Sequence, residues 1–564
     1  MKILKTTLSL SVVAIIILFA SCKKSVPKQI KYIPKDASFV FAANAKRLND
    51  KLEGSQVKID SLLKVVFTES KVAPEDIKKW EDLKDAGIDW QSDIFGFVQQ
   101  RGSMMSGTSQ VFGAVAAVSS ASKLEAYLKK QMPKATVKKV DGYSEIELDG
   151  DAVAGWNDEV LILTGATQTR SFSDDNAASG KTASTQLATL FKLKTEESAL
   201  AIDPFKNFIK EKADLLLWVN SGGAFNALPM LGMTKISDLV KDSYSGIVVN
   251  FENGKVEANI TSYSGKVMAD MIKKYPPSAV DLDMVTTYPS NNVTGLLSVN
   301  FDLGLIAEII RYGGFEATAN QYLTTLGFTV EDVTKAFKGD MAVVFSDFVV
   351  EEKSNPDYPE YKTKTPSIKY VFNAKVGDKA SYNKVLSALA AKGWLTQTAT
   401  GYTPAMPLGG FVVVELNEKN MLVASDSTLL GQYKTGTGKA GIPGDVISKG
   451  KGKVAYMYVD LSKIFSVIPV DSSSIDIMNQ VKATFKDAYV SADKYEGNTS
   501  KGVMELRTGN EKENSLATLV KLGWAVANKF KQEEARAAAA SDAAEAADSV
   551  AVDSTVAVPV APVK

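Results

Sequence analysis

The amino-acid sequence predicts an α+β protein made of two tandem duplicated domains, each a mostly antiparallel sheet with helices packed on its faces. Three observations lead to this fold class. Short apolar strands alternate with helical patterns along most of the chain, and the same motifs recur in order about 240 to 260 residues later. A chain of 564 residues is also too long for one hydrophobic core.

Residues 1–21 have the pattern of a lipoprotein signal peptide. Lys2 and Lys5 precede an apolar run over residues 12–20, which is too short for a transmembrane span of about 20 residues. Two small residues then precede Cys22, the only cysteine of the chain. A secretory signal followed by a chance cysteine is the alternative. We expect lipidation at Cys22 and attachment to a membrane through that N-terminal lipid.

Residues 22–31 are interpreted as a tether between the lipid and the first domain. Lys23 and Lys24 follow the cysteine, and no acid occupies the second position. This pattern is similar to lipoproteins sorted to the outer membrane, whereas surface-exposed lipoproteins tend to carry acids there. We therefore expect attachment to the outer membrane, with the periplasmic face favoured over the cell surface.

The repeated motifs place the first domain at residues 32–275 and the second at residues 293–531. Ser38–Asn44 is an apolar strand that ends in asparagine before a helical pattern, and Gly295–Asn300 has the same form. Further matches pair Asp93–Phe97 with Asp340–Val344, Phe112–Val118 with Tyr370–Val376, and Asp214–Asn220 with Val454–Asp460. Any one match is weak, but together they keep one order, as a duplication with small insertions would.

Two segments lie outside the predicted domains. Residues 276–292 begin Pro-Pro-Ser and are interpreted as a linker. Residues 532–564 consist almost wholly of Ala, Val, Ser and acids, so we expect a disordered tail with a helical tendency in its Ala-rich start.

The chain contains no histidine among its 564 residues. This excludes Ser-His-Asp and Cys-His catalysis within the chain, as well as histidine metal ligands. Because Cys22 is assigned to lipid, cysteine metal ligands are excluded too, and no cofactor or transition metal is expected. The 65 bases balance the 65 acids, which gives no general attraction to nucleic acid. Carboxylate chemistry remains open.

Several short motifs are better explained without catalysis. Ser381 and Lys384 form a Ser-x-x-Lys pattern, and Lys434–Gly436 supplies Lys-Thr-Gly, but the Ser-Asp-Asn partner motif is missing. The Asn and Asp residues that end strands are interpreted as helix N-caps, because a short side-chain oxygen can accept a bond from an unpaired backbone N–H. Four tryptophans are interpreted as core residues: Trp90, Trp156, Trp218 and Trp394.

Two long hairpin loops, residues 99–110 and 349–367, occupy the same place in the two predicted domains but differ in sequence. Either they are divergent contact surfaces on a shared scaffold, or they are hairpin tips that have drifted without function. The candidate contact residues are Arg101, Met104, Met105, Tyr358 and Tyr361.

The segment Tyr32–Val40 reads Tyr-Ile-Pro-Lys-Asp-Ala-Ser-Phe-Val. Together with the signal and the following strand-to-Asn motif, it resembles a Bacteroidetes-type lipoprotein family, domain of unknown function 4836. The resemblance covers the mature chain except the tail. It implies a cellular location and a fold, but no catalytic residue. We expect a non-catalytic envelope lipoprotein that binds an envelope protein or glycan. The alternative is an envelope hydrolase that uses carboxylates alone.

Overall fold

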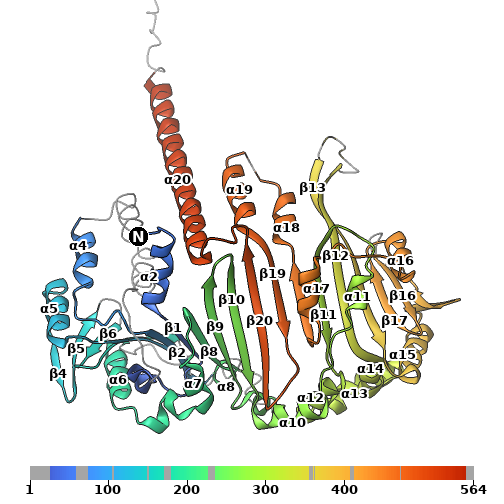
Figure 1. Ribbon diagram of the computed structural model, residues 1–564, viewed down its shortest axis with the longest axis horizontal. Helices are drawn as coiled ribbons and strands as arrows, with labels where there is room; N and C mark the ends of the chain where they lie inside the picture. Colours follow the sequence, from blue (N-terminus) through green and yellow to red (C-terminus); the bar gives the residue numbers. More distant parts are fainter. Residues whose placement is uncertain are drawn as a thin grey trace, which may run out of the picture.

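The computed structural model describes residues 26–58, 74–103, 107–148, 152–169, 179–225, 235–354, 358, 360, 362–406, 412–470 and 472–553. The predicted signal peptide and Cys22 lie outside the described residues. Within these ranges, twenty strands form one antiparallel sheet, and helices pack against it (Figure 1). The predicted α+β fold class is confirmed.

The first half of the chain contributes ten strands. They are β1 (Phe39–Ala43), β2 (Ile94–Ser103), β3 (Gly107–Ala117), β4 (Lys138–Val140), β5 (Tyr143–Leu148), β6 (Ala152–Trp156), β7 (Val160–Thr169), β8 (Leu215–Asn220), β9 (Tyr244–Glu252) and β10 (Lys255–Tyr263). Its helices are η1 (Lys28–Tyr32), α2 (Ala45–Gly54), α4 (Pro74–Leu83), α5 (Ala121–Gln131), α6 (Ser179–Phe191), η2 (Thr195–Glu197), η3 (Ala199–Ala201), α7 (Asp203–Phe208), α8 (Ser221–Phe225), α9 (Ser237–Val240) and α10 (Lys266–Lys274).

The second half contributes the other ten strands of the described sheet. They are β11 (Val293–Asn300), β12 (Phe337–Ser354), β13 (Lys362–Val376), β14 (Leu395–Thr398), β15 (Gly401–Pro404), β16 (Val413–Asn417), β17 (Asn420–Ala424), β18 (Ala455–Val459), β19 (Phe485–Ala492) and β20 (Thr499–Thr508). Its helices are α11 (Asp283–Thr286), α12 (Gly304–Tyr312), α13 (Glu316–Leu326), α14 (Val330–Ala336), α15 (Lys379–Ala391), α16 (Ser427–Lys434), α17 (Gly444–Gly450), α18 (Leu461–Val467), α19 (Ile475–Thr484) and α20 (Ser515–Asp553).

The strand order is the same in the two halves. The first half runs β4-β5-β6-β7-β3-β2-β1-β8-β9-β10. The second half runs β14-β15-β16-β17-β13-β12-β11-β18-β19-β20. A tandem duplication would produce this repeated order; descent from a duplication itself stays a prediction.

The two halves do not form separate domains. Strand β10 pairs antiparallel with β20 over their full common length, from Lys255 opposite Arg507 to Tyr263 opposite Thr499. Each half therefore covers the exposed edge of the other, where unpaired backbone groups would otherwise remain. One continuous sheet results, in place of the two independent sheets that the sequence suggested.

Each half also packs its last helix against the other half. Leu52 and Val57, at the end of α2 and just after it, pack with Ala517 of α20. At the opposite side, Lys274 of α10 forms a 3.0 Å ion pair with Glu308 of α12, and Tyr275 donates a 3.2 Å hydrogen bond to the same carboxylate. The sheet and these helix contacts therefore join the two halves.

Two segment predictions were wrong. In the predicted linker, Met284, Val285 and Tyr288 are buried in the core of the second half, so residues 276–292 do not form a free connection. In the predicted tether, Ile30 is fully buried in the core of the first half. Helix α20 extends into the Ala-rich start of the predicted tail as far as Asp553, and residues 554–564 lie outside the described part of the chain, so disorder there stays a prediction.

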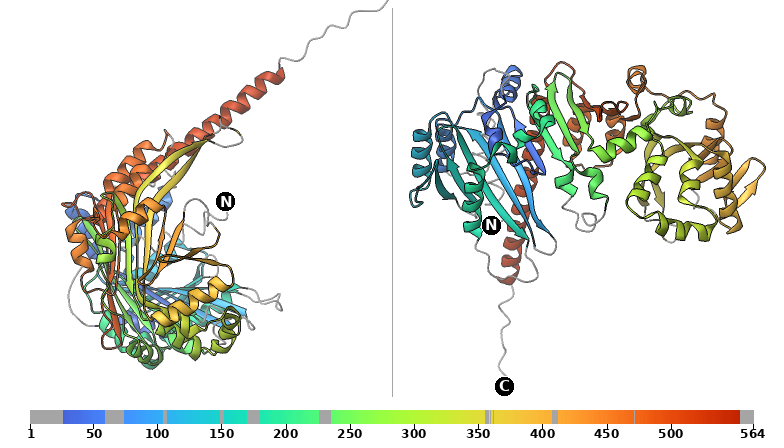
Figure 2. Two further views of the ribbon diagram at one scale, coloured as in Figure 1. Left: turned by 90° about the vertical axis from the view of Figure 1, so that its right-hand side faces the viewer. Right: turned by 90° about the horizontal axis from the view of Figure 1, so that it is seen from below.

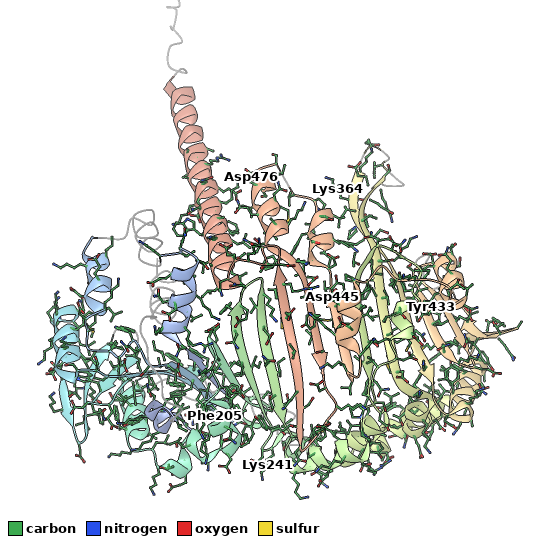
Figure 3. All side chains as sticks on the ribbon, viewed as in Figure 1. Phe205, Lys241, Lys364, Tyr433, Asp445 and Asp476 are labelled. Atoms are coloured by element: carbon green, nitrogen blue, oxygen red, sulfur yellow. The ribbon has the colours of Figure 1, made fainter. Side chains whose placement is uncertain are left out.

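One face of the sheet carries the two main cores. In the first half, Trp218 of β8 packs against Phe205 and Phe208 of α7, with ring centroids 5.2 and 5.3 Å apart. In the second half, Tyr456 of β18 lies in a core with Tyr433 of α16. Figure 3 labels Phe205 and Tyr433 in these two cores. We call this face of the sheet the covered face.

Candidate functional site

Among the described residues, helices cover the opposite face of the sheet only over its outer strands. In the first half, Leu124 and Leu128 of α5 pack on Ile146 and Trp156 of strands β5 and β6. In the second half, Leu386 of α15 packs near Leu416 of β16. The left-hand view of Figure 2 shows that the sheet is curved and that α15, drawn in gold, lies on the inner side of the curve. Between these two helices, apolar side chains of the central strands are exposed.

Six large apolar residues on five central strands have between 37% and 44% of their surface exposed: Phe39, Phe41, Phe112, Leu297, Met457 and Met504. Residues directly opposite in an antiparallel pair point to the same side. The register places one apolar row across eight consecutive strands, consisting of Leu215, Val249, Ala258, Met504, Val490, Met457, Leu297 and Val343. We call the uncovered side of the central strands, which carries this row and Phe39, Phe41 and Phe112, the open face.

The polarity of the open face changes along the direction of the strands. Towards one end, Ser245, Ser262 and Ser500 are directly opposite one another on β9, β10 and β20. The hydroxyls of Ser245 and Ser262 are 3.1 Å apart. Towards the other end, Val256 lies opposite Leu506. The open face therefore grades from a row of three hydroxyls, which we call the serine row, to an apolar surface.

The second half also contains a cavity of about 1110 Å³, whose charged side chains are mostly paired. Lys375 binds Asp281, and Lys434 Nζ lies 2.6 Å from Glu415 Oε2. Burial is the largest single effect on the Asp281 carboxyl and raises its pKa, but the bond and charge of Lys375 together with the backbone N–H of Asp283 lower the pKa overall. At Glu415, burial also raises the pKa, and the bonds from Lys434 and Asn417 with the charge of Lys434 lower it overall. These two carboxylates suit ion pairing rather than proton donation.

A cavity of about 940 Å³ in the first half contains the one carboxyl described here with a raised pKa. Burial raises the pKa of Asp93, against the opposing effects of a hydrogen bond from Asn44 and the charge of Arg47. Asn44 Nδ2 lies 2.5 Å from Asp93 Oδ1, and in the second half Asn300 Nδ2 lies 2.9 Å from Asp340 Oδ1. The Asn–Asp pair thus recurs at the same place in both halves.

The strand-ending polar residues act mainly as helix caps, as expected. The side-chain oxygens of Asn44, Asn220 and Asp460 accept hydrogen bonds from backbone N–H groups three residues later, at 3.0, 3.1 and 3.0 Å. Asn300 is the exception. Its side-chain oxygen accepts instead from the backbone of Ser278 at 2.6 Å, which ties the segment before β11 to the end of that strand.

Replacing Asp93 with asparagine is expected to make unfolding less sensitive to pH. Because the folded state raises the pKa of Asp93, its contribution to stability is full below the ordinary value of 3.8 and is lost as pH rises through the raised value. The substituted amide cannot ionise but keeps an oxygen that accepts from Asn44. Denaturant titrations at pH 4 and pH 7 should show the variant gaining stability relative to wild type at the higher pH. An equal difference in stability between the variant and wild type at both pH values would contradict the raised pKa of Asp93. The exposed control is Asp50→Asn.

The structure changes the interpretation of the two predicted interaction loops. Residues 99–103 and 107–110 belong to β2 and β3, and Arg101 lies opposite Ser109 in their ladder. Residues 349–354 and 362–367 likewise pair within β12 and β13, so most of both predicted loops is strand. Tyr358 is 59% exposed. Met104, Met105 and Tyr361 lie outside the described residues, so no common contact surface is assigned to these five candidates.

Sequence reasoning missed the open face, and one of its tryptophan assignments was wrong. Trp156 and Trp218 are buried as expected, whereas Trp394 is 57% exposed. The signal for the open face was present in Leu215–Val219, where every residue is apolar. Such a strand can face apolar surroundings on both sides.

No group of three or more acidic, histidine or cysteine side chains is placed to hold a metal ion within the described ranges. Among the helices that the structure describes, none is both long enough and apolar enough for a membrane span.

These features define a class of α+β protein with one continuous sheet of two like-ordered halves and an open apolar face. The chain belongs to the family described as Domain of unknown function (DUF4836), whose model matches residues 30–516. The family resemblance of the Tyr32–Val40 segment is thereby confirmed. A comparison with curated proteins found no match.

Solved structures similar to the chain include two crystal forms of the protein TP0453. Crystal form I is 10% identical with a TM-score of 0.23, and the match covers 43% of this chain and 81% of that one. Crystal form III is 9% identical with a TM-score of 0.24, covering 45% and 87%.

Proposed function

We propose that the protein is a non-catalytic lipoprotein of the cell envelope that binds an apolar partner on the open face. The observation that carries this proposal is the exposure of large apolar side chains along one continuous row of central strands. Contiguous apolar patches of more than a few hundred Å² are uncommon on monomers and usually mark interaction sites. A glycan suits this surface poorly, because it requires many hydrogen bonds that apolar side chains do not make.

The proposed cellular location rests on the N-terminal sequence. Lipid on Cys22 would hold the protein at the outer membrane, with the periplasmic face favoured because no acid follows the cysteine directly. Such an anchor keeps the open face near other envelope components, which raises the effective concentration of any membrane-derived partner.

The double substitution Met457→Glu and Met504→Glu tests the binding role of the open face. Both side chains are exposed, so the charges should be tolerated in folding while they disrupt the apolar surface. The full chain should bind the apolar dye Nile red, and the double variant should lose at least fivefold of the fluorescence increase. Ile475→Glu is the matched control, since Ile475 on α19 is 45% exposed but lies outside the open face. Equal dye binding by all three proteins would refute the proposal.

An envelope hydrolase that uses only carboxylates is the second candidate. The observation that favours it is the raised pKa of Asp93 in a cavity that Asp89 and Asp214 also line. A carboxyl whose pKa is raised keeps its proton to higher pH than an ordinary aspartate and is better suited to act as a general acid. Glycan hydrolysis by the purified protein that disappears in Asp93→Asn and persists in Asp50→Asn would favour this candidate.

A further inference from the structure

We propose that the open face binds the acyl chains of a phospholipid, with the headgroup at the serine row. This inference deepens the proposed function and rests on it. It identifies the apolar partner as a membrane lipid held individually, away from the bilayer.

The apolar row of the open face carries no hydroxyl, amide or charged side chain. The backbone N–H and C=O groups of the central strands are used in the ladders between them, and the row from Leu215 to Val343 has only apolar side chains. Interfaces between proteins normally make about one hydrogen bond per 100–200 Å². Hydrocarbon is the partner that leaves no polar group unpaired on such a surface.

The curvature of the open face favours a flexible partner. The open face lies on the inner side of the curved sheet, together with α15 (Figure 2). Two copies facing each other through inwardly curved surfaces would touch at their margins and leave a gap between their centres. A flat bilayer surface would meet the same difficulty. A flexible hydrocarbon chain can follow the curve, and Met457 and Met504 can adapt to it because unbranched thioether side chains change conformation easily.

The strands of the open face are long enough to hold a lipid acyl chain. Six residue steps separate Ser500 from Leu506, which corresponds to about 20 Å along β20. One leaflet takes up half of a hydrocarbon core of about 30 Å, so a lipid acyl chain needs about 15 Å. A chain that lies along the strands can therefore reach from the serine row to the apolar end.

The position of the polar groups also fits an amphiphile. Ser245, Ser262 and Ser500 lie on the same side as the apolar row, each four residues along its strand from the row members Val249, Ala258 and Met504. Hydroxyls can donate to phosphate or ester oxygens. The gradient of polarity along the open face thus matches that of an amphiphile whose head lies at the serine row.

Photocrosslinking of the full-length protein in intact cells tests this inference. The photoreactive amino acid p-benzoylphenylalanine replaces Met504, Met457 or, as a control of matched exposure, Ile475. After irradiation, mass spectrometry of the purified protein should show an adduct with the mass of a glycerophospholipid at positions 504 and 457. The yield at position 475 should be at least tenfold lower.

The other outcomes separate this inference from the proposed function. Adducts with another protein or with a second copy would overturn the lipid assignment, while dye binding to the open face would still support a binding protein. A free fatty acid adduct would overturn the assignment to phospholipid. Absence of any adduct at both positions, together with absence of dye binding, would overturn both proposals.

A second variant tests the placement of the headgroup. Replacing Ser262 and Ser500 with alanine removes two of the three hydroxyls without adding bulk or charge. The yield of the phospholipid adduct at position 504 should then fall severalfold, and circular dichroism should remain that of the wild type. An unchanged yield would refute the headgroup position.

Discussion

Replacing Cys22 with alanine is expected to move the protein from the membrane fraction to the soluble fraction, with at least a tenfold change in partition. Cys22 is the only cysteine, so it is the only residue whose thiol can carry a lipid. Stable anchoring generally needs more than one acyl chain, and all of them would be lost together in this variant. Fractionation of cell envelopes followed by intact-protein mass spectrometry gives both the location and the N-terminal residue.

The matched control for this prediction is Ser21→Ala, which keeps a small residue before the cysteine and should leave the protein on the membrane. Retention of the Cys22→Ala protein with an uncleaved signal peptide would still indicate processing at that cysteine. Normal membrane retention of the alanine variant, with the signal removed as usual, would show that the anchor lies elsewhere.

An anchor at Cys22 would hold the folded body close to the membrane. Val26 already packs against the core of the first half, and Ile30 is fully buried in it. The four residue steps from Cys22 to Val26 span at most about 14 Å. The tether is therefore shorter than the sequence suggested, since residues 28–31 belong to a folded element.

The local elements of the fold were predictable because their signals are local. Helices that begin after Asn44 and Asp460 follow from capping chemistry, and the caps form as expected. The order of matching motifs indicated two like halves, and the strand orders agree. The joining of β10 to β20 could not be predicted in this way, because hydrophobic patterns do not specify which two strand edges pair.

The long hairpins were taken for loops for a related reason. The outer part of β12 and β13 is polar and exposed on both sides, so no alternation of apolar and polar residues marks it as strand. Backbone pairing holds residues 349–354 against residues 362–367, with exposed side-chain contacts such as Lys362 Nζ to Glu352 Oε2 at 3.5 Å. Composition predicts burial well, but it says little about a ladder that projects into solvent.

The open face was missed because sequence reports the polarity of a strand but not the layers around it. Leu215 and Leu217 lie on the open face, while Leu216 and Trp218 are buried on the covered face. A strand apolar on both sides is normally interpreted as fully enclosed. Only the packing shows that α5 and α15 cover the outer strands and leave the central strands uncovered.

Replacing Asp214 with alanine is expected to lower the free energy of unfolding by about 3 kcal/mol. Its side chain is fully buried and accepts from Arg47 Nε at 3.1 Å, Lys51 Nζ at 2.6 Å and the backbone N–H of Phe251 at 2.7 Å. Alanine leaves all three donors without this partner, and a cation that loses its buried counter-charge is costly. Thermal or denaturant unfolding of the purified protein measures the loss.

Asp50→Ala on α2, the helix that carries Arg47 and Lys51, is the matched control, because Asp50 forms only an exposed pair with Lys46, at 3.0 Å. Such surface pairs contribute about 0–1 kcal/mol, so this variant should unfold almost as wild type does. The Asp214 network also holds α2 against β8 and β9, and α2 in turn packs on α20 from the other half. Limited proteolysis of Asp214→Ala should therefore cleave α2 and the adjoining part of α20 faster than in wild type. Equal losses of stability in the two variants would show that the buried carboxylate does not fasten the two halves together.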